Sequence, residues 1–141
     1  MKKFIAILLM TVVTISASIL VFAEQNMVNS KVVAYYFHGA FRCLTCTAME
    51  NYSREAIEAN HKDTLASGKL EFKTVNVENR GNEHFVDDYK LYTKSLILSL
   101  VKDGKEVRYK NLDKIWEYSR NKQKFIDYVA NEIKDFMKDV Q

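Results

Sequence analysis

The sequence has 141 residues but contains no proline, only four glycines and only two cysteines. Without proline, a cis peptide bond would cost about 3 kcal/mol, so a trans chain is the expectation. No glycine motif of the kind that binds flavins or nicotinamides is present, which gives no support to a nucleotide-dependent redox enzyme. We therefore expect no cofactor beyond what the two cysteines themselves supply.

The chain also lacks a large excess of either charge. It contains 21 Lys and Arg side chains against 18 Asp and Glu side chains, a net charge of +3. Removal of residues 1–23 would take Lys2 and Lys3 and no acid, leaving 19 basic side chains against 18 acidic ones. Such a balanced surface does not favour nucleic acid or an anionic surface as a partner.

Residues 1–23 have the pattern of an export signal. Lys2 and Lys3 form a basic start, residues 4–22 carry no charge, and residues 21–23 end on a small residue suited to cleavage. No cysteine lies in this segment, so a lipid-modified cysteine anchor is excluded. The apolar run is long enough that an uncleaved membrane anchor stays open as the alternative.

The rest of the chain is long enough for one domain. We place a polar linker at residues 24–30 and the domain itself at residues 31–141. With either a cleaved signal or a retained anchor, the domain is expected to be exported, in a periplasmic or other extracytoplasmic location.

The two cysteines form a C-x-x-C motif, which follows the apolar run 31–37 and opens a helical segment. Unpaired N–H groups and partial positive charge at a helix start favour a thiolate at Cys43, and Arg42 adds a neighbouring cation. The thiolate is the attacking species in thiol–disulfide exchange. We therefore interpret Cys43 as the nucleophile and Cys46, one turn further, as the resolving thiol.

Three other interpretations of the cysteine pair stay open. A structural disulfide is possible in an exported protein, but so short a loop gains little from cross-linking. Cys43, Cys46 and His38 together could hold zinc or copper(I), although this set is incomplete without a fourth ligand or a dimer. A non-catalytic binding module with a vestigial pair would keep its function when Cys43 is replaced.

Hydrophobic patterns predict an α/β domain with a central mixed sheet of about four strands, in βαβ then ββα order, flanked by helices. Ser53 is a candidate N-cap that would restart the first helix after a break near Asn51, and we interpret Trp116 as a core residue. Asp103-Gly104 is a strong hairpin signal between the last two strands. The predicted strands are 31–37, 70–77, 96–101 and 106–110, and the predicted helices are 43–66, 83–92 and 123–139.

This order of elements, with the C-x-x-C at the first helix, resembles the thioredoxin fold. Residues 37–46 are similar to the family's strand-to-motif run, with Phe41 where an aromatic residue usually precedes the first cysteine. The resemblance implies a thiol–disulfide oxidoreductase that acts on a protein redox partner. It also implies that Phe41 lies beside the motif on the substrate-binding surface. His38 lies within reach of the motif in this fold, either as a strand-end histidine that packs the loop or as a substrate-binding residue. A monomer is the expected state.

A narrower resemblance rests on four short pieces of sequence. They are F-H-G-x-F-R-C-x-T-C at 37–46, N-E-H-F at 82–85, Y-T-K-S at 92–95 and K-N-L-D-K-I-W at 110–116. Together they resemble the small exported proteins grouped as ArsF-like nitrophenyl-compound nitroreductase subunits. This resemblance implies an electron carrier that serves the reduction of aromatic nitro-arsenicals, beside a membrane-associated reductase or permease system.

The chain departs from the thioredoxin pattern at the position of the family's cis-proline. That position falls at Ser95 or Leu96, where a cis bond would be costly. The backbone there is the family's platform for an incoming disulfide, so Ser95 and Leu96 are our candidates for substrate contact on a trans chain.

The chain also lacks the buried acid that thioredoxins carry in the strand before the motif. Tyr36 or Phe37 occupies that place. Proton transfer to Cys46 would then fall to His38, to Glu50 or to water.

Overall fold

The computed structural model describes residues 29–140, so the predictions for residues 1–23 and for nearly all of the linker lie outside the described residues. No helix within the described part of the chain is long and apolar enough to cross a membrane. The strands are β1 (Ser30–His38), β2 (Leu70–Asn76), β3 (Ser95–Lys102) and β4 (Lys105–Asn111), and the helices are α2 (Leu44–Asn60), α3 (Lys62–Ala66), α4 (His84–Asp88) and α5 (Lys122–Phe136), with 3-10 turns at η1 (Asp113–Ile115) and η2 (Met137–Val140).

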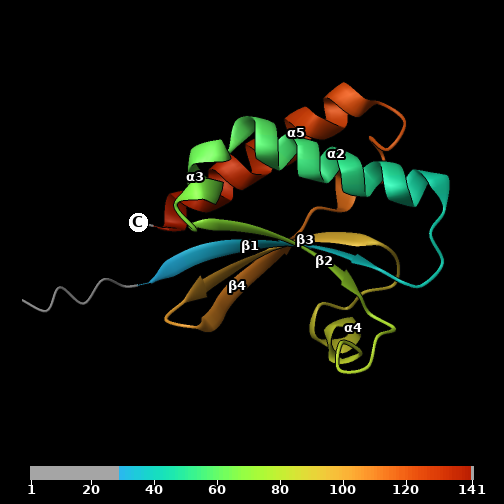
Figure 1. Cartoon of the computed structure of the whole chain (residues 1–141), viewed down its shortest axis with the longest axis horizontal. Helices are drawn as coiled ribbons and strands as arrows, with labels where there is room; N and C mark the ends of the chain where they lie inside the picture. The colour runs from blue at the N-terminus through green and yellow to red at the C-terminus, as the bar shows by residue number, and fades with distance from the viewer. Residues whose placement is uncertain (1–28, 141) are drawn as a thin grey trace, which may run out of the picture.

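The four strands form one mixed sheet in the order β2-β1-β3-β4. β1 is parallel to β2 and antiparallel to β3, and β4 is antiparallel to β3. Figure 1 shows α2, α3 and α5 above one face of this sheet and α4 below the other. The predicted α/β architecture, a thioredoxin-like fold with βαβ and ββα halves, is therefore confirmed.

β1 contributes to the cores on both faces of the sheet, because successive side chains of a strand point to opposite faces. Ala34 and Tyr36 belong to the larger core, beneath α2 and α5, while Phe37 belongs to a smaller cluster on the side of α4. Burial on both faces explains why β1 reads as a nearly continuous apolar run. α5 supplies the other half of the larger core through residues such as Phe125.

The hairpin between β3 and β4 forms where the Asp-Gly signal predicted it. Asp103 and Gly104 have φ angles of 50° and 78°, and positive φ at both central residues is what the twist of a two-residue hairpin requires. β4 is an exposed edge strand, and ion pairs from Arg108 to Asp139 and from Lys110 to Glu132 tie it to the C-terminal helical segment.

Two details of the predicted helices are wrong. α2 continues through Asn51 and ends at Asn60, because the buried Ser53 hydroxyl donates a 2.7 Å hydrogen bond to the Met49 carbonyl instead of capping a new helix. Trp116 is 39% exposed and lies in the turn between η1 and α5, so it is not a core residue.

Candidate active site

The two cysteines are joined in a disulfide, with their Cα atoms 5.0 Å apart. Cys43 is the N-cap of α2, and its Sγ accepts a hydrogen bond of 3.1 Å from the backbone N–H of Cys46. Cys46 is only 2% exposed, whereas Cys43 is partly exposed and Leu44 beside it is 92% exposed. A reacting sulfur from another molecule can therefore reach Cys43 but not Cys46.

The loop from β1 to α2 places Cys43 at this helix start. β1 ends at His38, and Gly39 opens the loop. A Cβ atom at residue 39 would collide with the Glu78 Oε1 atom, so a larger residue would displace that carboxylate. The glycine lets the chain leave the sheet beside Glu78 and turn toward the motif.

Tyr36 stands behind the disulfide, where sequence analysis found no acid. Its hydroxyl donates a 2.7 Å hydrogen bond to the Cys46 carbonyl, and its side chain is fully buried. Burial raises the pKa of Tyr36 to about 12, with nearby Arg42 opposing this rise. The phenol therefore stays protonated near neutral pH and acts as a hydrogen-bond donor that fixes the backbone at Cys46.

Arg42, the residue before Cys43, is paired with a carboxylate. Its guanidinium forms an ion pair with Glu50, whose side chain is only 14% exposed. Arg54 lies 3.7 Å from the same carboxylate, and the Thr74 hydroxyl on β2 lies 3.4 Å from it. The cation that the sequence assigns to the Cys43 thiolate is thus paired with a carboxylate in the disulfide form.

A hollow opens beside the partly exposed Cys43. It is lined by Cys43 and Thr45 from the motif and by four residues of the turn after η1. The indole N–H of Trp116 donates a 2.9 Å hydrogen bond to the Lys94 carbonyl, which fixes this turn against the loop before β3. The four residues contributed by the turn are Trp116, Glu117, Ser119 and Arg120.

Sequence reasoning missed the role of this turn. The available signal was the polar run from Glu117 to Asn121 that follows Trp116 and interrupts the apolar helical pattern. A tryptophan at the edge of such a run is at least as consistent with an exposed turn as with the core.

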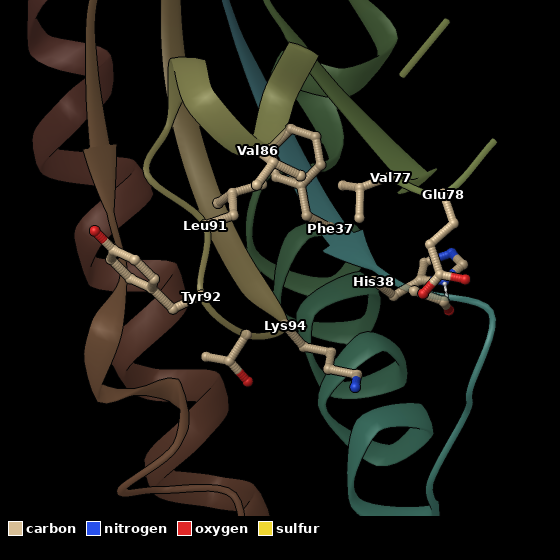
Figure 2. A pocket seen from close by; sticks show the side chains of 10 residues that line it. Phe37, His38, Val77, Glu78, Val86, Leu91, Tyr92 and Lys94 are labelled. Atoms are coloured by element: carbon tan, nitrogen blue, oxygen red, sulfur yellow. Dashed lines mark hydrogen bonds between the residues drawn. The ribbon is translucent and has the colours of Figure 1, made fainter. Parts of the chain in front are cut away.

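His38 lines a separate pocket of about 170 Å³ on the α4 side of the sheet. Figure 2 shows Phe37, Val77, Val86 and Leu91 along its apolar part, with His38, Glu78 and Lys94 at the polar end. The His38 Nδ1 atom lies 2.8 Å from the Gly39 carbonyl oxygen, so the ring donates this bond when Nδ1 carries the proton.

The structure does not bring His38 together with the cysteines as a metal-binding group. Within residues 29–140, no three His, Cys, Asp or Glu side chains gather closely enough to hold a metal ion. The interpretation of Cys43, Cys46 and His38 as a soft-metal set therefore lacks its third ligand in this arrangement.

The predicted substrate-contact positions before β3 are largely enclosed. Ser95 is mostly buried and its hydroxyl donates a 3.0 Å hydrogen bond to the Thr93 carbonyl, while Leu96 is fully buried and its carbonyl accepts from Leu112 N–H at 2.9 Å. No peptide bond within the described residues is cis. Phe41, by contrast, is 74% exposed next to the motif. Substrate contact at these residues stays a prediction.

No protein-family model matches the chain, and no curated protein matches its sequence. Among solved structures it is similar to a thioredoxin of Fasciola hepatica, with 18% identity and a TM-score of 0.43 over 79% of this chain and 82% of that one. It is also similar to oxidised thioredoxin O2 of Arabidopsis thaliana, with 12% identity and a TM-score of 0.40 over 67% of this chain and 74% of that one.

The strand order, the helix placement and the disulfide at the start of α2 together define the class. The chain is a thioredoxin-like α/β domain that carries a C-x-x-C pair at disulfide distance. The comparisons give no support to the narrower ArsF-like resemblance.

Proposed function

We propose that this protein is an exported thiol–disulfide oxidoreductase that exchanges electrons with a protein partner through Cys43 and Cys46. The observation that carries the proposal is the asymmetry of the pair. Cys43 caps α2 and is partly exposed, whereas Cys46 is 2% exposed behind it. This arrangement separates an attacking sulfur from a protected resolving sulfur, which two-step disulfide exchange requires.

In the direction that reduces the partner, the Cys43 thiolate attacks one sulfur of the partner's disulfide. A mixed disulfide forms, the partner's S–S bond breaks, and the released partner sulfur takes a proton from water. Cys46, once deprotonated, attacks the Cys43 sulfur, so the mixed disulfide breaks and the second partner sulfur is released and protonated. The partner gains two electrons and two protons, and the Cys43–Cys46 pair is oxidised.

The surface around Cys43 supports a polypeptide partner. Phe41 and Leu44 are 74% and 92% exposed, and Trp116 presents its partly exposed ring in the same hollow as Cys43. Exposed apolar side chains around a reactive atom are typical of a surface that another protein covers. The hollow is lined mostly by polar and charged side chains, unlike the largely apolar pockets that enclose small molecules.

The finer proposal follows from the ArsF-like sequence pieces. In such a system this chain would act outside the cytoplasm as an electron carrier for a membrane-associated reductase or permease system. A dithiol carries two electrons per cycle, so full reduction of a nitro group to an amine needs several deliveries. The nitro chemistry itself would belong to the partner.

The test combines a reduction potential with partner trapping. Thiol trapping of the purified chain across a glutathione series should give one two-electron transition; a value near −270 mV groups it with reductants and one near −120 mV with oxidants. In cells, Cys46→Ser should accumulate a mixed disulfide with a specific protein, identified by mass spectrometry. Failure of the chain to form an intramolecular disulfide would overturn the proposal.

Cys43→Ser is the matched control for the trapping experiment. It removes the attacking sulfur, so no mixed disulfide through residue 43 can form and the captured protein should disappear. If the protein's cellular role instead survives Cys43→Ser unchanged, the non-catalytic binding module replaces the oxidoreductase.

A further inference from the structure

Glu50 is the least exposed acid among the ion pairs of the described residues, with a side chain that is 14% exposed. It lies four residues after Cys46 and therefore on the same side of α2, one turn further along. A carboxylate so placed is the nearest acidic residue along the helix from the motif. Removal of its partners would leave it partly buried and poorly solvated.

Arg42 connects this carboxylate to the other end of the motif. It immediately precedes Cys43 in the chain, and its guanidinium reaches across the first turns of α2 to pair with Glu50. The same guanidinium acts electrostatically on the Tyr36 phenol, which holds the Cys46 carbonyl. Arg42 therefore connects the residue before Cys43 with the groups that surround Cys46.

The charge balance around Arg42 changes with the redox state. In the disulfide form both sulfurs are neutral, and Glu50 is the only ion-pair partner of Arg42 within residues 29–140. Reduction creates a thiolate at Cys43, which is a second anion within reach of the adjacent Arg42 side chain. The Glu50 carboxylate and the Cys43 thiolate then compete for one guanidinium.

We propose that Glu50 is a positioning residue that sets the redox poise of the Cys43–Cys46 pair by holding the Arg42 guanidinium away from the Cys43 sulfur. The inference deepens the proposed function and rests on it. Glu50 keeps the Arg42 guanidinium from the Cys43 thiolate, which destabilises the dithiol form. The pair is therefore a stronger reductant than it would be with Glu50 absent and Arg42 free to stabilise the thiolate.

The sign of the effect follows from the charges. Glu50→Gln removes one negative charge near Cys43 and frees Arg42 to approach the thiolate. Both changes stabilise the reduced form, so the pair becomes more oxidising. We expect the equilibrium constant with glutathione to shift by about threefold to tenfold, where tenfold corresponds to about 30 mV for this two-electron couple.

The experiment measures this equilibrium constant for the full chain, together with the pH midpoint of Cys43 alkylation by iodoacetamide. Glu50→Gln should make the pair more oxidising and lower the alkylation midpoint by about half a unit to one unit, since tenfold equals one unit. Glu58→Gln, an exposed acid on the same helix, is the control and should stay within about twofold of the wild type.

A double-mutant cycle separates an effect of Glu50 that acts through Arg42 from a direct effect of its negative charge on Cys43. If Glu50 acts through Arg42, the Glu50→Gln shift should fall to less than half of its logarithmic size in an Arg42→Ala background. Glu50→Asp keeps the charge but shortens the reach to Arg42, so it should shift the pair in the same direction as Glu50→Gln. If Glu50→Gln does not fold, Glu50→Asp provides the test in its place.

The inference is overturned if a folded Glu50 variant keeps the wild-type equilibrium constant, or if the shift is equal with and without Arg42. In the first case Glu50 only straps α2 to β2 through Thr74, which would change stability but not the equilibrium with glutathione. These readouts need no partner. A chain that shows the Glu50 effect but traps no partner in cells refutes the proposed function and leaves this inference standing.

Discussion

The hollow at Cys43 and the pocket at His38 differ in the side chains that line them and in whether a sulfur atom is present. The hollow is lined by the turn around Trp116 and contains the partly exposed sulfur. The pocket is small and floored by apolar side chains such as Phe37 and Leu91, and no sulfur lines it. The more apolar concavity is therefore not the one that contains the cysteine pair.

The comparison shows what thiol–disulfide exchange demands of a surface. Exchange between macromolecules needs a reachable sulfur at a site that favours the thiolate, and it does not need a cavity to enclose a substrate. The N-cap position of Cys43 supplies this. The pocket, with Glu78 and Lys94 at its polar end, shares no lining residue with the hollow.

The largest expected effect is the difference in exchange rate between substitutions at the hollow and substitutions at the pocket. Cys43→Ala should abolish exchange with a protein disulfide, because the attacking sulfur is gone. Glu78→Gln combined with Lys94→Met, at the pocket, should leave the exchange rate within about twofold of the wild type, because neither side chain lines the hollow. The measurement is the rate of reduction of a fluorescently labelled protein disulfide. Loss of exchange in the pocket variant would show that the pocket belongs to the active site.

The second prediction concerns stability rather than chemistry. Phe37 is almost fully buried beneath the pocket, with its ring centroid 5.1 Å from that of Phe85 and 5.4 Å from that of Tyr89. Phe37→Ala should lower the free energy of unfolding by about 3–5 kcal/mol, measured by urea denaturation of the disulfide form. The reduction potential of the folded variant should stay unchanged. A shifted potential would mean that the two concavities are coupled through β1.

Much of this architecture follows from local sequence patterns. The apolar run of β1, the Asp103-Gly104 hairpin and the terminal helix α5 were all predictable, because each has a strong signal within about ten residues. The C-x-x-C at the start of a helix was predictable for the same reason. The fold class and the position of the disulfide therefore needed no long-range information.

The missing parts depend on contacts between distant segments. The 39% exposure of Trp116 depends on a hydrogen bond to Lys94, which lies 22 residues away in the chain. Sequence analysis placed Arg42 beside Cys43, but it could not show that Glu50 takes up the guanidinium. No local pattern encodes which of two anions a long, flexible cation will contact.

The third prediction sharpens the contrast between the rims of the two concavities. Trp116 lines the hollow and Tyr92 lines the pocket, and both rings are exposed. Trp116→Ala should slow exchange with a protein disulfide by about threefold to tenfold, because it removes apolar contact area beside Cys43. Tyr92→Ala should leave that rate unchanged. Stopped-flow kinetics with a small aliphatic disulfide provide the control, since neither substitution should affect a substrate too small to reach these rings.

The smallest expected effect tests the two faces of β1 through adjacent residues. Tyr36 points toward the motif and Phe37 toward the pocket, so Tyr36→Phe removes only the hydrogen bond to the Cys46 carbonyl. At neutral pH this should cost about 1 kcal/mol. A urea denaturation curve measured near neutral pH gives this value directly.

The Tyr36 hydroxyl also makes the stability of the fold change with pH in the alkaline range. Burial raises the pKa of Tyr36 from 10.0 to about 12, so the folded state favours the protonated phenol. This contribution is fully present below about pH 10 and is lost as the pH rises toward about 12. Tyr36→Phe should therefore lose less stability across that window than the wild type, whereas Tyr109→Phe, on the exposed edge strand β4, should follow the wild type. If the two variants instead respond alike, the buried phenol behind the disulfide does not control the alkaline transition.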